Sequence, residues 1–207
     1  INQNEIHTAF NGYVDIEDSF GHDNEIAKYS YIMGFLSTFA LNNVVKHNRE
    51  LGISPMGVYD MAKICNQNPL DVCSIVSEAM YKGAIHASCR YAQRSGEIDV
   101  NYHGSSFSNG LPQFALRKFK PKSNWDATCE VMKRGMMNSK LTAQAPTATT
   151  SMLTGVAESV TIPISILMAR ESENGRNDII SYGFITHLMQ QPEKNIDLNN
   201  SLSTQLL

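Results

Sequence analysis

The chain has 207 residues, 42% of them hydrophobic and 18% charged, so it is long enough to bury a core and too apolar for a disordered protein. Its formal net charge of −3 argues against a protein that wraps nucleic acid or lies on an anionic membrane. No apolar run approaches the roughly 20 residues that cross a bilayer, and no secretory signal opens the sequence.

The N-terminal part of the chain predicts loops, a long helix, a turn and a short helix. Residues 1–24 are polar and rich in turn residues, so we expect loops there, loose or held by a partner segment. Over 25–44, apolar residues recur at helical spacing on most of the circumference, which predicts a buried helix. The Gly- and Pro-containing segment 51–57 predicts a short strand or a turn, and 58–65 predicts a short helix.

The central part predicts one long helix followed by an irregular stretch. Asn68 suits a helix cap because its side chain can accept a bond from the first turn, and Pro69 suits the first helical position. We expect this helix to end near Arg94. Small polar residues crowd 97–112, which is typical of a surface loop.

The next part of the chain predicts alternating helices and strands. Ser123 and Asp126 have the spacing of a capping box, which predicts a helix over 125–138. Apolar and β-branched residues predict buried strands over 141–145 and 162–168. This alternation indicates the α/β class, with more helix than strand.

A Thr-rich turn follows the first of these strands. Pro146 ends the strand, and we expect a short helix from about Ser151. Further along, the pattern predicts a helix over 179–190. The Asn- and Ser-rich tail over 195–207 is expected to be loose unless another segment holds it.

The Thr-rich turn is the segment whose residues point to a chemical role. The N-terminus of a helix has unpaired N–H groups and the positive end of a dipole, so it attracts anions. Small side chains let an oxygen approach those N–H groups, and Thr hydroxyls add donors. We therefore predict a phosphate or diphosphate site made of Pro146, Thr147, Ala148, Thr149 and Thr150. Ordinary capping of a helix by Thr or Ser is the alternative, and spacing alone does not decide between the two.

Cysteine and histidine give no pattern of a metal site. The four cysteines form no CxxC pair, and the six histidines are scattered without an HxxxH or HExxH pairing. The sequence therefore predicts no metal on this chain. Sparse cysteines also fit a reducing compartment, so we expect a cytoplasmic protein.

Four stretches in colinear order carry a resemblance to a known family. The run Asn138-Ser139, 145–150, Gly155 and Glu158-Ser159 is close to the pattern R-N-S-x-L-x-A-x-x-P-T-A-S-T-x-x-x-x-G-x-x-E-S. Residues 48–60 are similar to the pattern R-x-L-G-I-G-V-x-G-L-A-D, and residues 102–114 to F-x-G-S-x-x-S-x-G-x-L-Q. Residues 41–45 are similar to L-D-N-V-I. Together they resemble the large, catalytic subunit of class I ribonucleotide reductase in a divergent form, such as that of a virus or phage.

This resemblance implies a ten-stranded α/β barrel, of which residues 1–207 would form the C-terminal portion of the catalytic domain. In that family the Pro-Thr-Ala-Ser-Thr turn holds the substrate diphosphate, which implies the same role for 146–150. The implied reaction is the radical reduction of ribonucleoside diphosphates to deoxyribonucleotides, as in deoxyribonucleotide synthesis for DNA replication. Because the first residue is Ile1, we expect the sequence to be a piece of a longer or split protein.

The chain departs from the family in its redox residues. It has no N-x-C-x-E loop, no paired radical-transfer tyrosines and no C-terminal cysteine pair, so no catalytic residue is assigned on it. The implied partners are the rest of the large subunit with the radical cysteine, and a small subunit that carries the radical and its metal. An oligomer and a nucleoside diphosphate substrate are also implied, whereas no cofactor on this chain, no nucleic acid and no membrane are expected.

Two alternatives to a working reductase stay open at this point. A reductase-like protein that has lost catalysis could act as a binding or scaffold module, which the changes near Ser54-Pro55 and Thr161-Ile162 allow. A helical phosphate-binding protein unrelated to the family is the other alternative. The absence of parallel strands flanking Pro146 would favour that second alternative.

Overall fold

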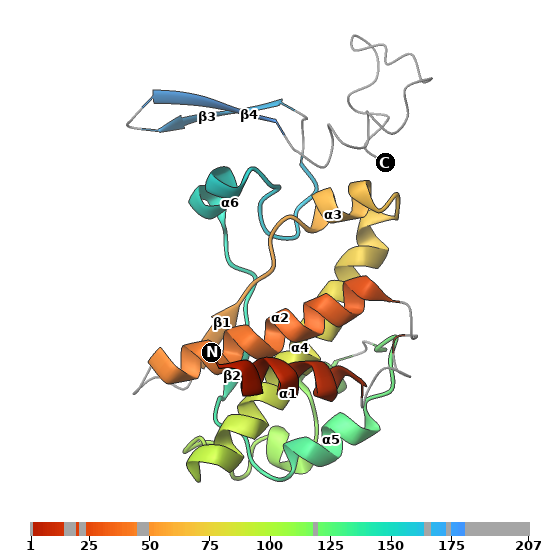
Figure 1. Cartoon of the computed structure of the whole chain (residues 1–207), viewed down its shortest axis with the longest axis vertical. Coiled ribbons are helices and arrows are strands. Elements are labelled where there is room, and N and C mark those ends of the chain that lie inside the picture. The colour runs from red at the N-terminus through yellow and green to blue at the C-terminus, as the bar shows by residue number, and fades with distance from the viewer. Residues whose placement is uncertain are drawn as a thin grey trace. The chain divides into compact units, whose positions relative to one another are not determined.

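The computed structural model describes residues 2–14, 20, 24–44, 50–117, 120–163, 167–172 and 175–180 (Figure 1). The chain divides into two units. Unit 1 comprises Ile1–Ser54 and Ser74–Gln144, and unit 2 comprises Pro55–Cys73 and Ala145–Leu207. None of the helices in the described ranges is long and apolar enough to cross a membrane.

Unit 1 begins with helix α1, Gln3–Val14, which corrects the expectation of loops over 1–24. The side chain of Asn2 caps this helix by accepting the N–H of Glu5 at 3.1 Å. Ala9 and Tyr13, four residues apart on one face of α1, are buried against α2. The sequence predicts a turn at the Asn11-Gly12 pair, but the pair lies inside α1. The helix continues through it because α2 covers the apolar face of α1.

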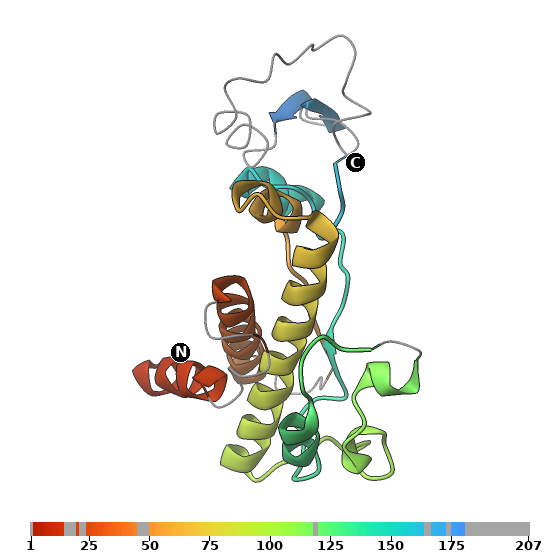
Figure 2. The ribbon, with the colours of Figure 1, turned by 90° about the vertical axis from the view of Figure 1, so that its right-hand side faces the viewer.

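Helix α2, Glu25–Val44, has the predicted bounds, and the long helix α4, Pro69–Ser95, crosses it closely. A Cβ added at Gly34 would clash with the carbonyl oxygen of Met80, and one added at Gly83 would clash with that of Tyr31. The crossing is therefore backbone against backbone. Figure 2 shows α1 and α2 on the same side of α4.

The outer face of α2 differs from the expectation of a helix buried around most of its circumference. Tyr29, Met33, Leu41 and Val44 are exposed, the first two by 56% and 59%. The buried face carries Tyr31, Phe35 and Phe39 instead, and it packs on α1 and α4. Because α2 has apolar residues on both faces, its sequence does not show which face another element covers.

Strands β1, Glu50–Ile53, and β2, Lys140–Thr142, pair in parallel with Glu50 opposite Lys140. The expected strand over 141–145 is thus shorter than predicted, although the Ala143 N–H still donates to the Ile53 carbonyl at 3.1 Å. Leu141 is buried in the core that α4 forms with the loops around it.

Helix α5 spans Asp126–Met132 and ends six residues before the predicted boundary at 138. Gly135 adopts a φ of 124°, which turns the chain away from the helix. The expected capping box is also wrong, because the N–H and hydroxyl of Ser123 donate to the buried carboxylate of Glu78 on α4. The loop before α5 contains two short 3-10 helices, at Phe107–Asn109 and Gln113–Leu116.

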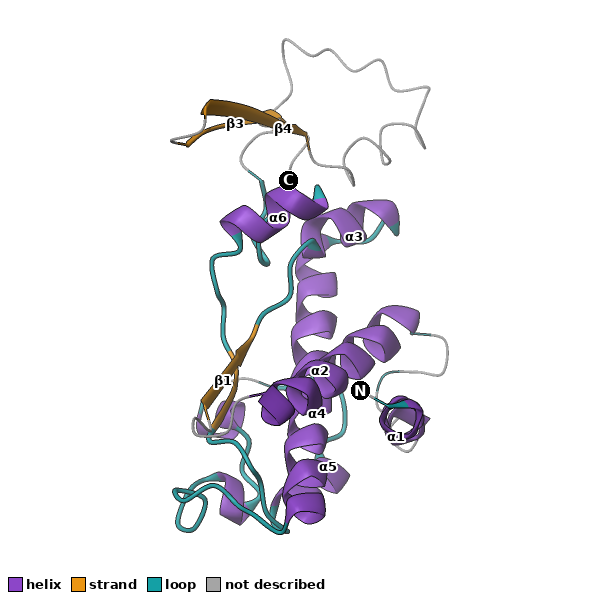
Figure 3. Ribbon diagram, turned by 60° about the vertical axis from the view of Figure 1, so that its left-hand side comes forward, coloured by secondary structure: helices purple, strands orange, loops and turns teal. Residues whose placement is uncertain are grey.

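Unit 2 contains α3, the start of α4, α6 and one antiparallel hairpin. Helix α3, Val58–Ile64, confirms the predicted short helix, and Asn68 caps α4 by accepting the Leu70 N–H at 2.8 Å. Helix α6, Ala148–Thr154, begins three residues before the expected start at Ser151. The hairpin pairs β3, Leu167–Ser172, with β4, Gly175–Ile180 (Figure 3).

The hairpin changes two expectations for the C-terminal part. Of the strand predicted over 162–168, residues 162–163 are not in a strand, residues 164–166 lie outside the described residues, and 167–168 belong to β3. Residues 179–180 belong to β4 rather than to the start of a helix. The rest of the predicted helix 179–190 and the tail 195–207 lie outside the described residues. The structure therefore shows a helix-rich α/β protein with two two-stranded sheets in its described part, and the ten-stranded barrel stays a prediction.

Candidate functional site

The predicted phosphate-binding residues lie in the turn that leads into α6. The N–H of Ser151 donates to the carbonyl of Thr147 at 2.8 Å and makes the first bond of this helix. The N–H groups of Ala148, Thr149 and Thr150 precede that bond, so they have no partner within the helix. Three successive donors therefore remain at the start of α6.

The hydroxyl groups of the turn have different surroundings. Thr149 and Thr150 are exposed in the first turn of α6, as is Pro146 before it, whereas Thr147 is half-buried. The Thr147 side chain makes no cap bond to the helix and instead accepts the N–H of Ser159 at 2.8 Å. The alternative of ordinary capping by Thr is therefore not what the structure shows at this turn.

The loop that follows α6 packs against the turn and bonds to it through Ser159 and Thr147. Ser159 has a φ of 50°, its side chain is buried, and its hydroxyl has no hydrogen-bond partner within the described residues. The N–H of Val156 donates to the carbonyl of Ser151 at 3.1 Å. Because Ser159 also donates to Thr147, this loop fixes the path of the chain into α6.

Helix α3 anchors this supporting loop at one residue. The N–H of Ala157 donates to the carboxylate of Asp60, and the carbonyl of Ala157 accepts the N–H of Gly57 at 2.9 Å. Gly57 adopts a φ of 72°, a conformation that favours glycine, and it lies at the N-terminal end of α3. The sequence did not identify Asp60 as part of the site, because it lies 97 residues from Ala157 and no local pattern connects them.

The turn offers donors without a formal positive charge. Residues 146–161 contain no Lys, Arg or His, and Glu158 is the one ionisable side chain among them. An anion would be held by N–H groups, hydroxyls and the dipole of a short helix. This arrangement suits a phosphate group that approaches the backbone closely, since Ala148 and the hydroxyl residues are small.

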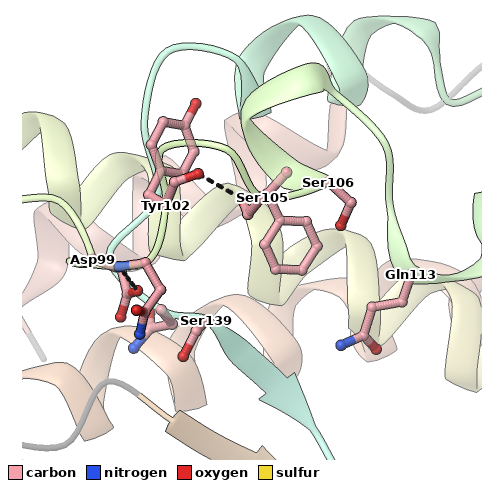
Figure 4. A pocket seen from close by; sticks show the side chains of 9 residues that line it. Asp99, Tyr102, Ser105, Ser106, Gln113 and Ser139 are labelled. Atoms are coloured by element: carbon pink, nitrogen blue, oxygen red, sulfur yellow. Dashed lines mark hydrogen bonds between the residues drawn. The ribbon is translucent and has the colours of Figure 1, made fainter.

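A second concave feature lies in unit 1, directly before β2. It is a pocket of about 190 Å³ (Figure 4). Nine residues line it, and they are Asp99, Asn101, Tyr102, Ser105, Ser106, Phe107, Gln113, Asn138 and Ser139. The side chains of Asn138 and Asn42 exchange two hydrogen bonds of 2.9 Å, which fixes the floor of this segment to α2. The sequence had placed Asn138-Ser139 in a motif but had not predicted a pocket there.

Two ionisable side chains of α4, Lys82 and His86, make structural contacts inside unit 1. Lys82 is fully buried, donates to the Asn124 carbonyl at 2.5 Å, and has a pKa lowered to about 8 by burial. His86 lies 2.7 Å from the Tyr31 hydroxyl and 3.2 Å from that of Thr128, and burial lowers its pKa to about 4. These groups hold α2, α4 and the segment before and within α5 together.

Two thiols of unit 1 are protonated at neutral pH. Burial raises the pKa of Cys89 to about 12, and burial together with the nearby Asp126 carboxylate raises the pKa of Cys129. Neither thiol therefore has the lowered pKa that an activated nucleophile needs. Within the ranges that the structure describes, no three His, Cys, Asp or Glu side chains come together in a way that could hold a metal ion.

Comparison with known proteins gives one family. The family model of the barrel domain of ribonucleotide reductase matches residues 30–205. The ribonucleoside-diphosphate reductase large subunit of Monkeypox virus is 29% identical over 165 residues, which are 76% of this chain and 21% of that protein. The ribonucleoside-diphosphate reductase large chain of Encephalitozoon cuniculi is 29% identical over 171 residues, which are 76% of this chain and 22% of that protein. The large chain of Schizosaccharomyces pombe is 31% identical over 130 residues, which are 61% of this chain and 16% of that protein. The chain thus spans about a fifth of the length of the viral and Encephalitozoon cuniculi relatives.

Proposed function

This chain belongs to the ribonucleotide reductase barrel-domain family, and from that premise we propose that it is part of the large, catalytic subunit of a ribonucleoside-diphosphate reductase. The resemblance predicted from four colinear motifs is confirmed by the family match over 30–205. That match also removes the alternative of an unrelated helical phosphate-binding protein. The proposed reaction is the radical reduction of ribonucleoside diphosphates to deoxyribonucleotides.

In this proposal the turn 146–150 holds the diphosphate of the substrate. The observation that carries it is the open first turn of α6, where three N–H groups precede the first helical bond and two Thr hydroxyls are exposed. Thr147 is held by Ser159 and therefore positions the turn, while Ala148, Thr149 and Thr150 would donate to phosphate oxygens. Holding the substrate by its diphosphate orients the ribose without any chemical step at this turn.

The redox chemistry belongs, in this proposal, to partner polypeptides. The rest of the large subunit would bring the radical cysteine, and a separate small subunit would bring the radical and its metal. The raised pKa values of the Cys89 and Cys129 thiols support that division, because neither is an activated nucleophile. We place the assembly in the cytoplasm, where its thiols would stay reduced and where nucleoside diphosphates are present.

The direct test of the proposed site is a double substitution in the first turn of α6. Thr149→Val plus Thr150→Val keeps the volume of both side chains and removes both exposed hydroxyls. We expect about a tenfold or greater loss of affinity for ADP, GDP, CDP or UDP, whichever binds, in the protein assembled with its partners. Isothermal titration calorimetry gives the dissociation constants directly.

The matched control for this experiment is Thr154→Val, which removes a hydroxyl from the last turn of the same helix. Within the described residues, the Thr154 hydroxyl donates to carbonyls of its own helix, at 3.0 Å to Thr150 and 3.3 Å to Ser151. The control should leave nucleotide affinity unchanged. Equal affinity of the double variant and the unchanged protein would reject the turn as the diphosphate site.

The competing proposal is a reductase-like protein without catalysis. It is supported by Val160 to Pro163, where the family has a Glu-Pro pair after Glu158-Ser159. The sequence that flanks this chain in its genome separates the two. An N-x-C-x-E loop upstream and a pair of tyrosines downstream support the enzyme, and their absence from the assembly supports the scaffold.

A further inference from the structure

The pocket before β2 has a chemical character different from that of the Thr-rich turn. Figure 4 shows Asp99 and Ser139 on one side of it and Gln113 on the other, with Ser106 above. The walls come from the loop that follows α4, the start of the second 3-10 helix, and the residues that lead into β2. Asp99 is the one charged residue among the nine that line the pocket.

The Asp99 carboxylate is buried without a counter-ion. Its residue is 4% exposed, and the structure gives the carboxylate one hydrogen bond, in which Oδ1 accepts the N–H of Asn101 at 2.8 Å. Within the described ranges, no Lys, Arg or His nitrogen lies within ion-pair distance of it. A buried charge without a partner is unfavourable, so this carboxylate should attract a cation into the pocket.

The backbone around Asp99 holds the carboxylate in place. The N–H of Asp99 donates to the Met136 carbonyl at 2.9 Å, and the Asp99 carbonyl accepts the N–H of Tyr102 at 3.0 Å. The Tyr102 hydroxyl donates to the Met132 carbonyl at 2.7 Å. The carboxylate is thus pre-organised by α5 and the turn after it.

The other polar side chains of the pocket supply hydrogen-bond acceptors. Ser105 uses its hydroxyl locally, donating to the Tyr102 carbonyl at 2.6 Å, but Ser106, Ser139 and the Gln113 amide make no side-chain hydrogen bond within the described part of the chain. Phe107 adds an aromatic wall, and it is buried. A planar group with several donors matches this set of acceptors and this wall.

We propose that this pocket binds a guanidinium group, with Asp99 as its counter-ion and Ser106, Gln113 and Ser139 as further acceptors. A guanidinium combines a delocalised charge, donors in a fixed fork and a flat face that stacks on an aromatic ring. A phosphate is disfavoured because the carboxylate would repel it. A bare divalent cation is disfavoured because Mg²⁺ and Ca²⁺ take oxygen ligands, whereas the Phe107 ring in the lining offers them none.

A guanidinium can reach the pocket as a free small molecule or as the Arg side chain of a partner polypeptide. Two probes separate these sources, agmatine for the free molecule and acetyl-Ala-Arg-Ala-amide for the side chain, each titrated calorimetrically into the full chain. Agmatine is the tighter ligand if the pocket serves a free molecule. The peptide is at least as tight if it serves a polypeptide.

The decisive variant is Asp99→Asn, which keeps the shape of the side chain and an oxygen for the Asn101 N–H. We expect it to weaken binding of the tighter probe by about tenfold or more. Glu97→Gln is the matched control, because it removes the same charge from an exposed residue two positions away, and its effect should stay within about twofold. N-methylurea, which is flat but neutral, should not compete.

A second variant keeps the test valid if Asp99→Asn does not fold. Ser106→Ala plus Gln113→Leu removes two acceptors at half-buried and exposed positions, so it should leave the thermal unfolding temperature unchanged while it weakens binding. The proposal is overturned if neither probe binds, if both variants bind as tightly as the unchanged chain, or if Mg²⁺ or inorganic phosphate binds at Asp99 in preference to the probes.

Discussion

His86 shows how one half-buried ring connects three helices of unit 1. It lies on α4, contacts the Tyr31 hydroxyl from α2 at 2.7 Å, and contacts the Thr128 hydroxyl from α5 at 3.2 Å. Burial, and next the nearby Lys82 ammonium, lower its pKa from 6.5 to about 4. The folded chain therefore keeps this ring neutral under conditions where the unfolded chain would protonate it.

This shift predicts a loss of stability in mild acid. Between pH 6.5 and about 4 the unfolded chain binds a proton at this position that the folded chain does not, so the free energy of unfolding falls as the pH falls. His86→Gln keeps a polar side chain but does not titrate. We expect urea unfolding of the two chains at pH 7 and pH 4.5 to show a smaller loss for the variant, by about 1–3 kcal/mol.

The comparison at two pH values separates titration from packing. His86→Gln will also lower stability at pH 7 if it loses one of the two contacts, but that loss is the same at both pH values. Equal losses of stability between pH 7 and pH 4.5 in both chains would show that folding does not lower the pKa of His86.

At the scale of the elements, helices α2 and α4 cross with backbone against backbone. Among the glycines of the described residues, Gly83 and Gly34 at this crossing leave the least room for a Cβ. At Gly83 an added Cβ would clash with the Tyr31 carbonyl oxygen and lie 3.0 Å from the Phe35 nitrogen. Both contacts are with backbone, which cannot move aside as a flexible side chain would. The gain in helix propensity from Gly to Ala, about 1 kcal/mol, is therefore smaller than the cost of separating the helices.

We accordingly predict that Gly83→Ala destabilises the chain. A net loss of about 1–3 kcal/mol would lower the midpoint of thermal unfolding by several degrees. Gln93→Ala is the control on the same helix, because Gln93 is exposed and its replacement should have little effect. Circular dichroism on heating measures both, and a midpoint for Gly83→Ala at or above that of the unchanged chain would contradict the close crossing.

Local patterns in the sequence predicted the elements whose signals are local. Helix α2 and the start of α4 follow from periodicity and from the Asn68 cap, and the structure confirms both. Helix α1 was missed because Gly12 was interpreted as a turn residue. An added Cβ there would lie 2.7 Å from the Tyr31 hydroxyl, so Gly12 allows α1 to approach α2. That reason lies in the tertiary contact and not in the neighbouring residues.

In the candidate site, too, some residues are recognisable from their neighbours in the sequence and others only from the fold. The Thr-rich turn was recognisable because strand, proline and hydroxyl residues follow one another in the chain. Its support by Asp60 joins residues 97 positions apart, and Ser123 bonds to Glu78 across 45 positions instead of capping α5. Such pairings depend on the fold, which a single sequence does not reveal.

At the scale of the whole chain, the exposed faces of α1 and α2 set its behaviour outside an assembly. On α2 they are Tyr29, Met33 and Val44, with exposures of 56%, 59% and 77%, and on α1 Val14 is exposed by 63%. Apolar side chains gathered on one face of a helix are normally covered by another element. In the function proposed above, the rest of a large subunit would cover this face of α2.

We therefore expect the isolated chain to associate in solution. Tyr29→Glu plus Met33→Glu places two charges on the exposed face of α2 and should shift the chain towards the monomer in sedimentation velocity experiments. Asn4→Glu plus His7→Glu adds the same number of carboxylates at exposed polar positions of α1, and it should leave the association unchanged. If the unchanged chain sediments as a monomer and unfolds in one sharp thermal transition, the uncovered face of α2 does not require a partner.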